Sequence, residues 1–128
     1  MRTASLLTAA ACLFAATPAF ATGTIHCTPP GRGGPQLYLS VGNSPSAITQ
    51  ARLVDGPLTL ITGEGARSPR ITQSWLDRYM LRLDMADANV ENFIARLDTR
   101  KGGGVSFDGT LSYRNRTWRI SCRWDEDE

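Results

Sequence analysis

The sequence predicts an all-β fold: a small antiparallel β-barrel or sandwich in which the first and last strands are adjacent. Short apolar segments recur between breaks rich in glycine and proline, such as residues 29–35 and 102–104. Several of these segments alternate apolar and polar residues, which is the period of a half-buried strand. Two cysteines, Cys27 and Cys122, lie near opposite ends of the chain. In an exported protein such a pair indicates a disulfide.

The expected strands follow one another in chain order. They are residues 24–28, 36–41, 48–54, 58–61, 78–85, 92–98, 105–107, 110–113 and 117–124. In the second of them Leu37, Leu39 and Val41 share one face, as the period of two requires. Asp108-Gly109 is interpreted as a turn or a bulge, because glycine adopts positive φ at little cost.

Residues 69–98 also fit a second interpretation. Four apolar residues have the spacing of one helix face: Val90, Phe93, Ile94 and Leu97. Ser68-Pro69 has the form of a helix start. An α+β fold with one or two helices within residues 69–98 is therefore the alternative. Strands are favoured because residues 84–89 have the composition of a turn between two alternating runs.

The last segment carries the clearest alternation. Trp118, Ile120, Cys122 and Trp124 occupy one face of a strand, and the polar residues between them occupy the other. Arg114-Asn115-Arg116 is expected to be the turn before it, since asparagine tolerates the left-handed conformation. A disulfide from Cys122 to Cys27 would place the last strand beside the first. Such pairing favours a closed or nearly closed barrel.

The N-terminal residues predict export. Arg2 precedes an apolar run over residues 4–16, and Ala19-Phe20-Ala21 has the small residues of a cleavage site. Residues 1–21 are therefore interpreted as a signal peptide, 22–124 as a single β-rich domain and 125–128 as an acidic tail. We expect a monomeric bacterial protein in the periplasm or secreted, without membrane insertion after the signal is removed.

No residue pattern points to catalysis. His26 is the single histidine. The third cysteine, Cys12, lies in the predicted signal peptide, so no cysteine and histidine cluster supports a metal site. No phosphate-binding loop or nucleophile motif is present. The net charge of +2 is too small to indicate nucleic-acid binding. The sequence therefore predicts a protein that is not an enzyme and has no cofactor, no metal and no nucleic-acid partner.

Arginines on the solvent faces of the expected strands are the candidate binding surface. Arg82, Arg96, Arg119 and Arg123, with Trp124 at a strand end, would form one stripe if their strands are neighbours. Such a stripe would attract an anionic polymer or an acidic envelope protein. The alternative is a solvated polar face.

The three aromatics Tyr38, Trp75 and Tyr113 are further surface candidates. Exposed beside arginines, they would suit contact with a carbohydrate or a protein. The alternative is that they cover the mouths of the barrel.

Gly65-Ala66-Arg67-Ser68 is similar to the Ser-Gly-Ala-Arg-Tyr-type stretch of periplasmic lysozyme inhibitors of the small barrel type, although the tyrosine is missing. The layout also resembles that group, in which a signal precedes a compact barrel whose ends can be joined by a disulfide. No functional residue is transferred from it. The expected function is a small, exported, non-catalytic binding domain of the bacterial envelope. The alternatives are a periplasmic inhibitor of a cell-wall hydrolase and a structural accessory protein of an envelope complex.

Overall fold

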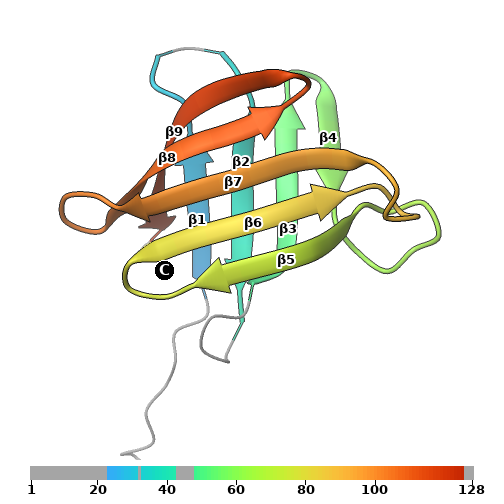
Figure 1. The fold of residues 1–128 in the computed structure, drawn as a ribbon, viewed down its shortest axis with the longest axis horizontal. Coiled ribbons are helices and arrows are strands. Elements are labelled where there is room, and N and C mark those ends of the chain that lie inside the picture. Colours follow the sequence, from blue (N-terminus) through green and yellow to red (C-terminus); the bar gives the residue numbers. More distant parts are fainter. Residues whose placement is uncertain (1–22, 32, 43–47, 126–128) are drawn as a thin grey trace, which may run out of the picture.

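The computed structural model describes residues 23–31, 33–42 and 48–125. In them, nine antiparallel strands form one sheet in the order β4-β3-β2-β1-β9-β8-β7-β6-β5 (Figure 1). The strands are β1 Gly23–Thr28, β2 Gln36–Val41, β3 Ile48–Asp55, β4 Leu58–Ile61, β5 Arg70–Leu76, β6 Met80–Ala86, β7 Phe93–Lys101, β8 Ser106–Tyr113 and β9 Arg116–Asp125. The all-β prediction is confirmed. The predicted signal peptide, residues 1–21, and the tail residues 126–128 lie outside the described residues.

The alternative of helices within residues 69–98 is wrong, because this region consists of β5, β6, β7 and their turns. In β6, Leu81, Leu83 and Met85 are buried while Arg82 is exposed. The period of two therefore decided the structure, and the helical spacing in the sequence was a coincidence. No helix in the described part of the chain is long and apolar enough to cross a bilayer.

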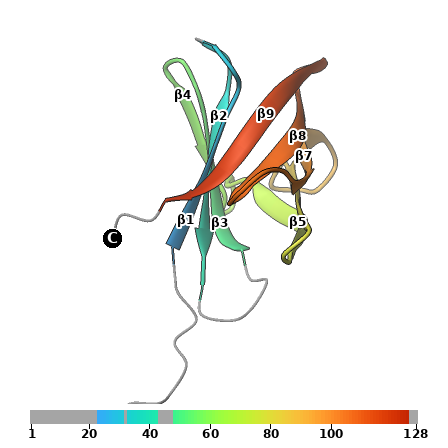
Figure 2. The same cartoon turned by 90° about the vertical axis from the view of Figure 1, so that its left-hand side faces the viewer.

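The sheet is curled into a half-barrel whose two halves pack against each other. β1 to β4 run behind the layer formed by β5 to β8, and the long strand β9 passes from one layer to the other (Figures 1 and 2). The inner faces of both layers supply the core. Its most buried aliphatic residues are Ile25, Leu37, Leu39, Leu53, Leu81, Leu83, Leu97 and Leu111.

The first and last strands are adjacent, as predicted. Cys27 and Cys122 are directly opposite in the β1–β9 register, are fully buried and form the expected disulfide. This adjacency does not close the sheet. The strands at the two ends of the chain meet in the middle of the strand order, so that the free edges are β4 and β5. The expected closed or nearly closed barrel is thus a half-barrel stapled at its centre.

The β8–β9 hairpin has the predicted turn. Arg114 and Asn115 both have positive φ, 53° and 61°. Two successive left-handed residues between paired strands make a type I′ turn, which matches the twist of a hairpin.

Asp108-Gly109 is neither a turn nor a bulge but lies inside the continuous strand β8. Gly109 pairs in regular register with Thr99 on one side and Ile120 on the other. A Cβ at this position would overlap the backbone of Asp98 and Thr99. The glycine is needed here because the backbone of β7 comes so close.

A hydrogen bond ties the two halves at one end of the molecule. The Tyr113 hydroxyl, on β8, donates to Asp55 Oδ2, at the end of β3, at 3.0 Å. Arg114 Nη1 lies 3.7 Å from the same oxygen. Burial, followed by the hydrogen bond to Asp55, raises the pKa of Tyr113 above its ordinary value.

Candidate functional site

A hollow of about 620 Å³ lies on the outer face of β5, β6 and β7, the face turned away from the core. Its lining residues are Gln73, Ser74, Trp75, Met80, Arg82, Leu83, Asp84, Arg96, Leu97 and Asp98. The hollow adjoins β5, beside which no further strand pairs among the described residues. A ligand can therefore enter both from the face and from the edge of the sheet.

Four charged residues, Arg82, Asp84, Arg96 and Asp98, form the centre of the hollow and are called here the charge ladder. Arg82 is opposite Asp98 and Asp84 is opposite Arg96 in the β6–β7 register. Arg82 Nε donates to Asp98 Oδ1 at 3.0 Å. Arg96 donates from Nε and Nη2 to the two oxygens of Asp84, at 2.9 and 3.1 Å. The two ion pairs alternate in sign across the strands.

Arg96 is the most firmly held member of the ladder. Its two-pronged contact fixes the plane of the guanidinium against Asp84, whose side chain is only 13% exposed. The guanidinium carbon also lies 4.8 Å from the centre of the Phe93 ring. The hydrogen bonds to Asp84, followed by the charge of that carboxylate, raise the pKa of Arg96 above its ordinary value.

The other pair leaves polar groups available to a ligand. The side chains of Arg82 and Asp98 are 48% and 47% exposed. Only Nε of Arg82 and Oδ1 of Asp98 are used in this pair, and the two Nη groups and Oδ2 have no hydrogen-bond partner among the described residues. The Gln73 side chain, opposite Asp84, likewise makes no hydrogen bond within the described chain. Donors and acceptors therefore lie side by side on a rigid sheet.

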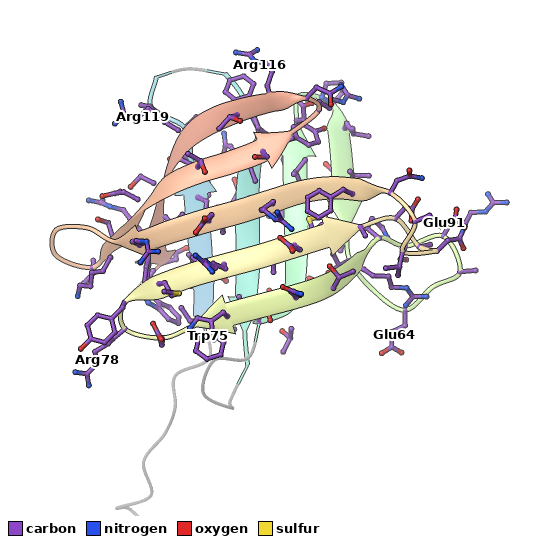
Figure 3. All side chains as sticks on the ribbon, viewed as in Figure 1. Glu64, Trp75, Arg78, Glu91, Arg116 and Arg119 are labelled. Atoms are coloured by element: carbon purple, nitrogen blue, oxygen red, sulfur yellow. A yellow bond between two sulfur atoms is a disulfide. The ribbon has the colours of Figure 1, made fainter. Side chains whose placement is uncertain are left out.

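Trp75 stands at the open margin of the hollow, on the edge strand (Figure 3). The residue is 54% exposed, and its Nε1 donates to Asp77 Oδ2 at 2.9 Å. The other oxygen of Asp77 accepts from the backbone N–H groups of Tyr79 and Met80, at 2.7 and 2.9 Å. These bonds lower the pKa of Asp77. The β5–β6 turn thus holds an exposed indole in a defined orientation.

The predicted arginines occupy the outer face but do not make one cationic stripe. One cross-strand row, from β5 to β9, contains Trp75, Arg82, Asp98, Thr110 and Arg119. β8 separates the ladder from β9, and aspartates alternate with the arginines. The charge of Arg82 and Arg96 is balanced by ladder carboxylates.

The candidates on β9 are divided between its two faces. Arg119 and Arg123 are exposed on the outer face, and the structure shows no ion pair for either within its described residues. Trp124 is on the inner face, where it packs against the core. It is also partly exposed and, together with Arg123, lines a hollow where β1 pairs with β9.

The other aromatic candidates differ in exposure. Tyr113 is buried, whereas Tyr38 is half-buried on the outer face of β2. There its ring stacks on His26 at 4.3 Å and lies beneath Arg52 at 4.2 Å. Gln36 Oε1 accepts from the Tyr38 hydroxyl at 3.1 Å and contacts His26 Nε2 at 3.0 Å. Because His26 and Arg52 cover the faces of the Tyr38 ring, this group of side chains offers a ligand little aromatic surface.

Sequence reasoning did not include Asp84, Asp98 or Gln73 in the candidate surface. A signal for the carboxylates was present, since Arg-Leu-Asp occurs twice, at residues 82–84 and 96–98. Antiparallel pairing of two such tripeptides about their leucines sets each arginine against an aspartate. No group of acidic, histidine and cysteine side chains suited to a metal ion occurs in the described ranges. Searches against protein-family models, curated proteins and solved structures found no match.

Proposed function

We propose that this chain is an exported, non-catalytic binding domain of the bacterial envelope, which holds its ligand in the hollow on β5, β6 and β7. The observation that carries the proposal is the pairing of an exposed, oriented Trp75 with unused donors and acceptors on the neighbouring ladder. Binding sites commonly combine an aromatic surface with a few fixed polar groups.

The geometry favours binding over catalysis. Each ladder carboxylate is already hydrogen-bonded to an arginine, an arrangement that fixes shape and compensates charge. No nucleophile with an adjacent base lies among the hollow's lining residues.

The disulfide supports export. Buried disulfides persist in oxidising compartments and are rare in the cytosol, and the Cys27–Cys122 bond is consistent with such a compartment. Together with the predicted signal peptide at residues 1–21, it favours the periplasm or the extracellular medium.

The proposal is tested by amide chemical-shift mapping of the chain from Thr22, titrated with separated polysaccharide, protein and lipid fractions of a bacterial envelope. We expect shifts confined to β5, β6 and β7, which Trp75→Ala should weaken. Ile61→Ala is the matched control, because it shortens an exposed apolar residue on the other sheet edge. Arg119→Gln examines the β9 surface. If the chemical-shift changes are lost in Arg119→Gln but unaffected in Trp75→Ala, the binding site lies on β9 instead.

A second candidate function, inhibition of a cell-wall hydrolase, is favoured by the β4–β5 loop. Residues 63–67 of this loop are all exposed, and Glu64 points away from the sheet (Figure 3). Arg70 donates from Nη1 to Gly63 O at 2.9 Å and from Nη2 to Gly65 O at 3.4 Å. A loop fixed before binding loses little entropy when it enters an enzyme cleft.

This candidate is tested in a bacterial lysis assay with a panel of muramidases. An inhibitor should slow lysis at a near-stoichiometric dose, and Arg67→Ala should restore it. Arg100→Ala is the control, an exposed arginine on β7 far along the chain from the loop. Undiminished lysis at a large molar excess of the protein would exclude the inhibitor function for the enzymes tested.

A further inference from the structure

We infer that the ligand of the hollow is an uncharged oligosaccharide, with one sugar ring packed on Trp75 and the next across the charge ladder. This inference rests on the proposed binding function of the same face and names its ligand class. Three properties of the hollow support it: its charge balance, the directionality of its polar groups and the orientation of the indole.

The charge balance of the hollow selects against charged ligands. The ladder holds two arginines and two aspartates, and each charge faces its opposite across the β6–β7 pairing. In the part of the chain that the structure describes, no other charged side chain lines the hollow. An anionic polymer would meet a carboxylate beside every arginine, and a cationic ligand would meet the reverse. A neutral ligand avoids both repulsions.

The polar groups of the hollow suit hydroxyl groups. A sugar hydroxyl both donates and accepts, so it is best satisfied where a donor and an acceptor lie next to each other. Arg82 supplies free Nη donors next to the free Oδ2 of its partner Asp98, and Gln73 supplies both functions in one side chain. Because their ion pair holds Arg82 and Asp98 in place, these two side chains lose little entropy on binding.

The indole supplies an apolar surface. One face of a pyranose ring is lined by C–H groups, which can pack on an aromatic plane. Trp75 offers such a plane at the open edge, where its N–H is already bonded to Asp77. Because that bond satisfies the only polar group of the indole, the ring can act as a flat, preoriented apolar surface.

The test uses neutral tetrasaccharides as probes, one of glucose and one of N-acetylglucosamine, with an oligogalacturonate as the anionic comparison. Amide shifts of the intact chain locate binding, and fluorescence titration measures affinity. We expect a neutral probe to shift amides in β5, β6 and β7. Its affinity should change little between about 50 mM and about 500 mM salt, because no net charge is neutralised.

Three variants separate the contributions. Trp75→Ala should weaken binding roughly tenfold or more, in line with the cost of removing a central aromatic contact. Arg82→Lys keeps the charge but removes the planar fork, so it should weaken binding if hydrogen-bond direction matters. Ile61→Ala should bind as the wild type does.

The outcomes distinguish this inference from the function on which it rests. Preferential, salt-sensitive binding of the anionic probe would overturn the neutral-ligand inference. So would wild-type affinity in Trp75→Ala. If no sugar binds while a protein or lipid fraction of the envelope shifts the same amides in a Trp75-dependent way, the binding function stands and the sugar inference fails. If no fraction and no sugar shifts this face, both fail.

Discussion

Reduction of the Cys27–Cys122 bond should be the most costly single change to this fold. The bond closes a loop of 95 residues, and the chain-entropy relation gives about 4.7 kcal/mol for a loop of that length at 25 °C. This is a large fraction of the roughly 5–15 kcal/mol by which a domain is stable. The bond also joins the centre of the sheet, where β1 pairs with β9.

The measurement compares oxidised and reduced wild-type protein in urea. Reduction keeps both sulfur atoms in the core, so that the difference reports the cross-link and not a cavity. With a slope of about 1–3 kcal/mol per molar urea, the midpoint should fall by roughly 2–4 M. In a thermal scan the melting temperature should fall by on the order of 20 °C.

Hydrogen exchange adds the location of the effect. In the reduced protein the backbone pairing of β1 with β9, the Tyr113–Asp55 bond and the core still hold the two halves together. On reduction, the hydrogen-exchange rates of backbone amides in β1 and β9 should therefore rise more than those in the β6–β7 pair. A stability difference below about 1 kcal/mol, or equal acceleration throughout the sheet, would refute this account of the staple.

Three further changes, one of them with a matched control, test other parts of the fold. Gly109→Ala should lower the free energy of unfolding by about 1–3 kcal/mol, since its Cβ overlaps β7. Gly103→Ala, whose Cβ meets open space, should have a much smaller effect in the same urea titration. Val90, with φ of 58° and 58% exposed, carries a left-handed strain that Asn tolerates, so Val90→Asn should raise stability by about 1 kcal/mol in thermal unfolding. The pKa of Tyr113 is raised above 10.0 in the folded state, so its contribution is present below pH 10 and lost as pH rises through the folded value. Tyr113→Phe should therefore flatten the decline in stability above pH 10, measured by urea unfolding at several alkaline pH values.

The strands with clean alternation were predictable from sequence, and the edge strand was not. Residues 36–41 and 58–61 match β2 and β4, and 117–124 differs from β9 by one residue at each end. β5 was missed because neither of its faces is consistently buried. A register shift between Ile71 and Gln73 further breaks its period. An edge strand packs on one neighbour only, so burial imposes a weaker pattern on its sequence.

The candidate site was only partly predictable for a related reason. Arg82 and Arg96 could be assigned to a solvent face from alternation alone. Their neutralisation by Asp98 and Asp84 depends on the pairing register of β6 with β7. Register is set by turn geometry and by packing of the opposite face, where Leu83 pairs with Leu97. The repeated Arg-Leu-Asp tripeptide would have predicted both ion pairs, provided that the two segments were paired about their leucines.

The position of the hollow follows from where the sheet is anchored. Because the terminal strands meet in the middle and are stapled there, the free edges come from the middle of the chain. An exposed edge strand invites unwanted pairing. The β-bulge near Ile71 and the exposed polar side chains of Thr72 and Gln73 reduce that risk at β5. Trp75 remains exposed on this edge and does not pack in the hydrophobic core. A stable centre with an open edge thus allows a large aromatic side chain to lie beside fixed polar groups at the edge of the sheet. In a fully closed barrel every strand edge is paired, so a ligand could approach such a site only from the outer face.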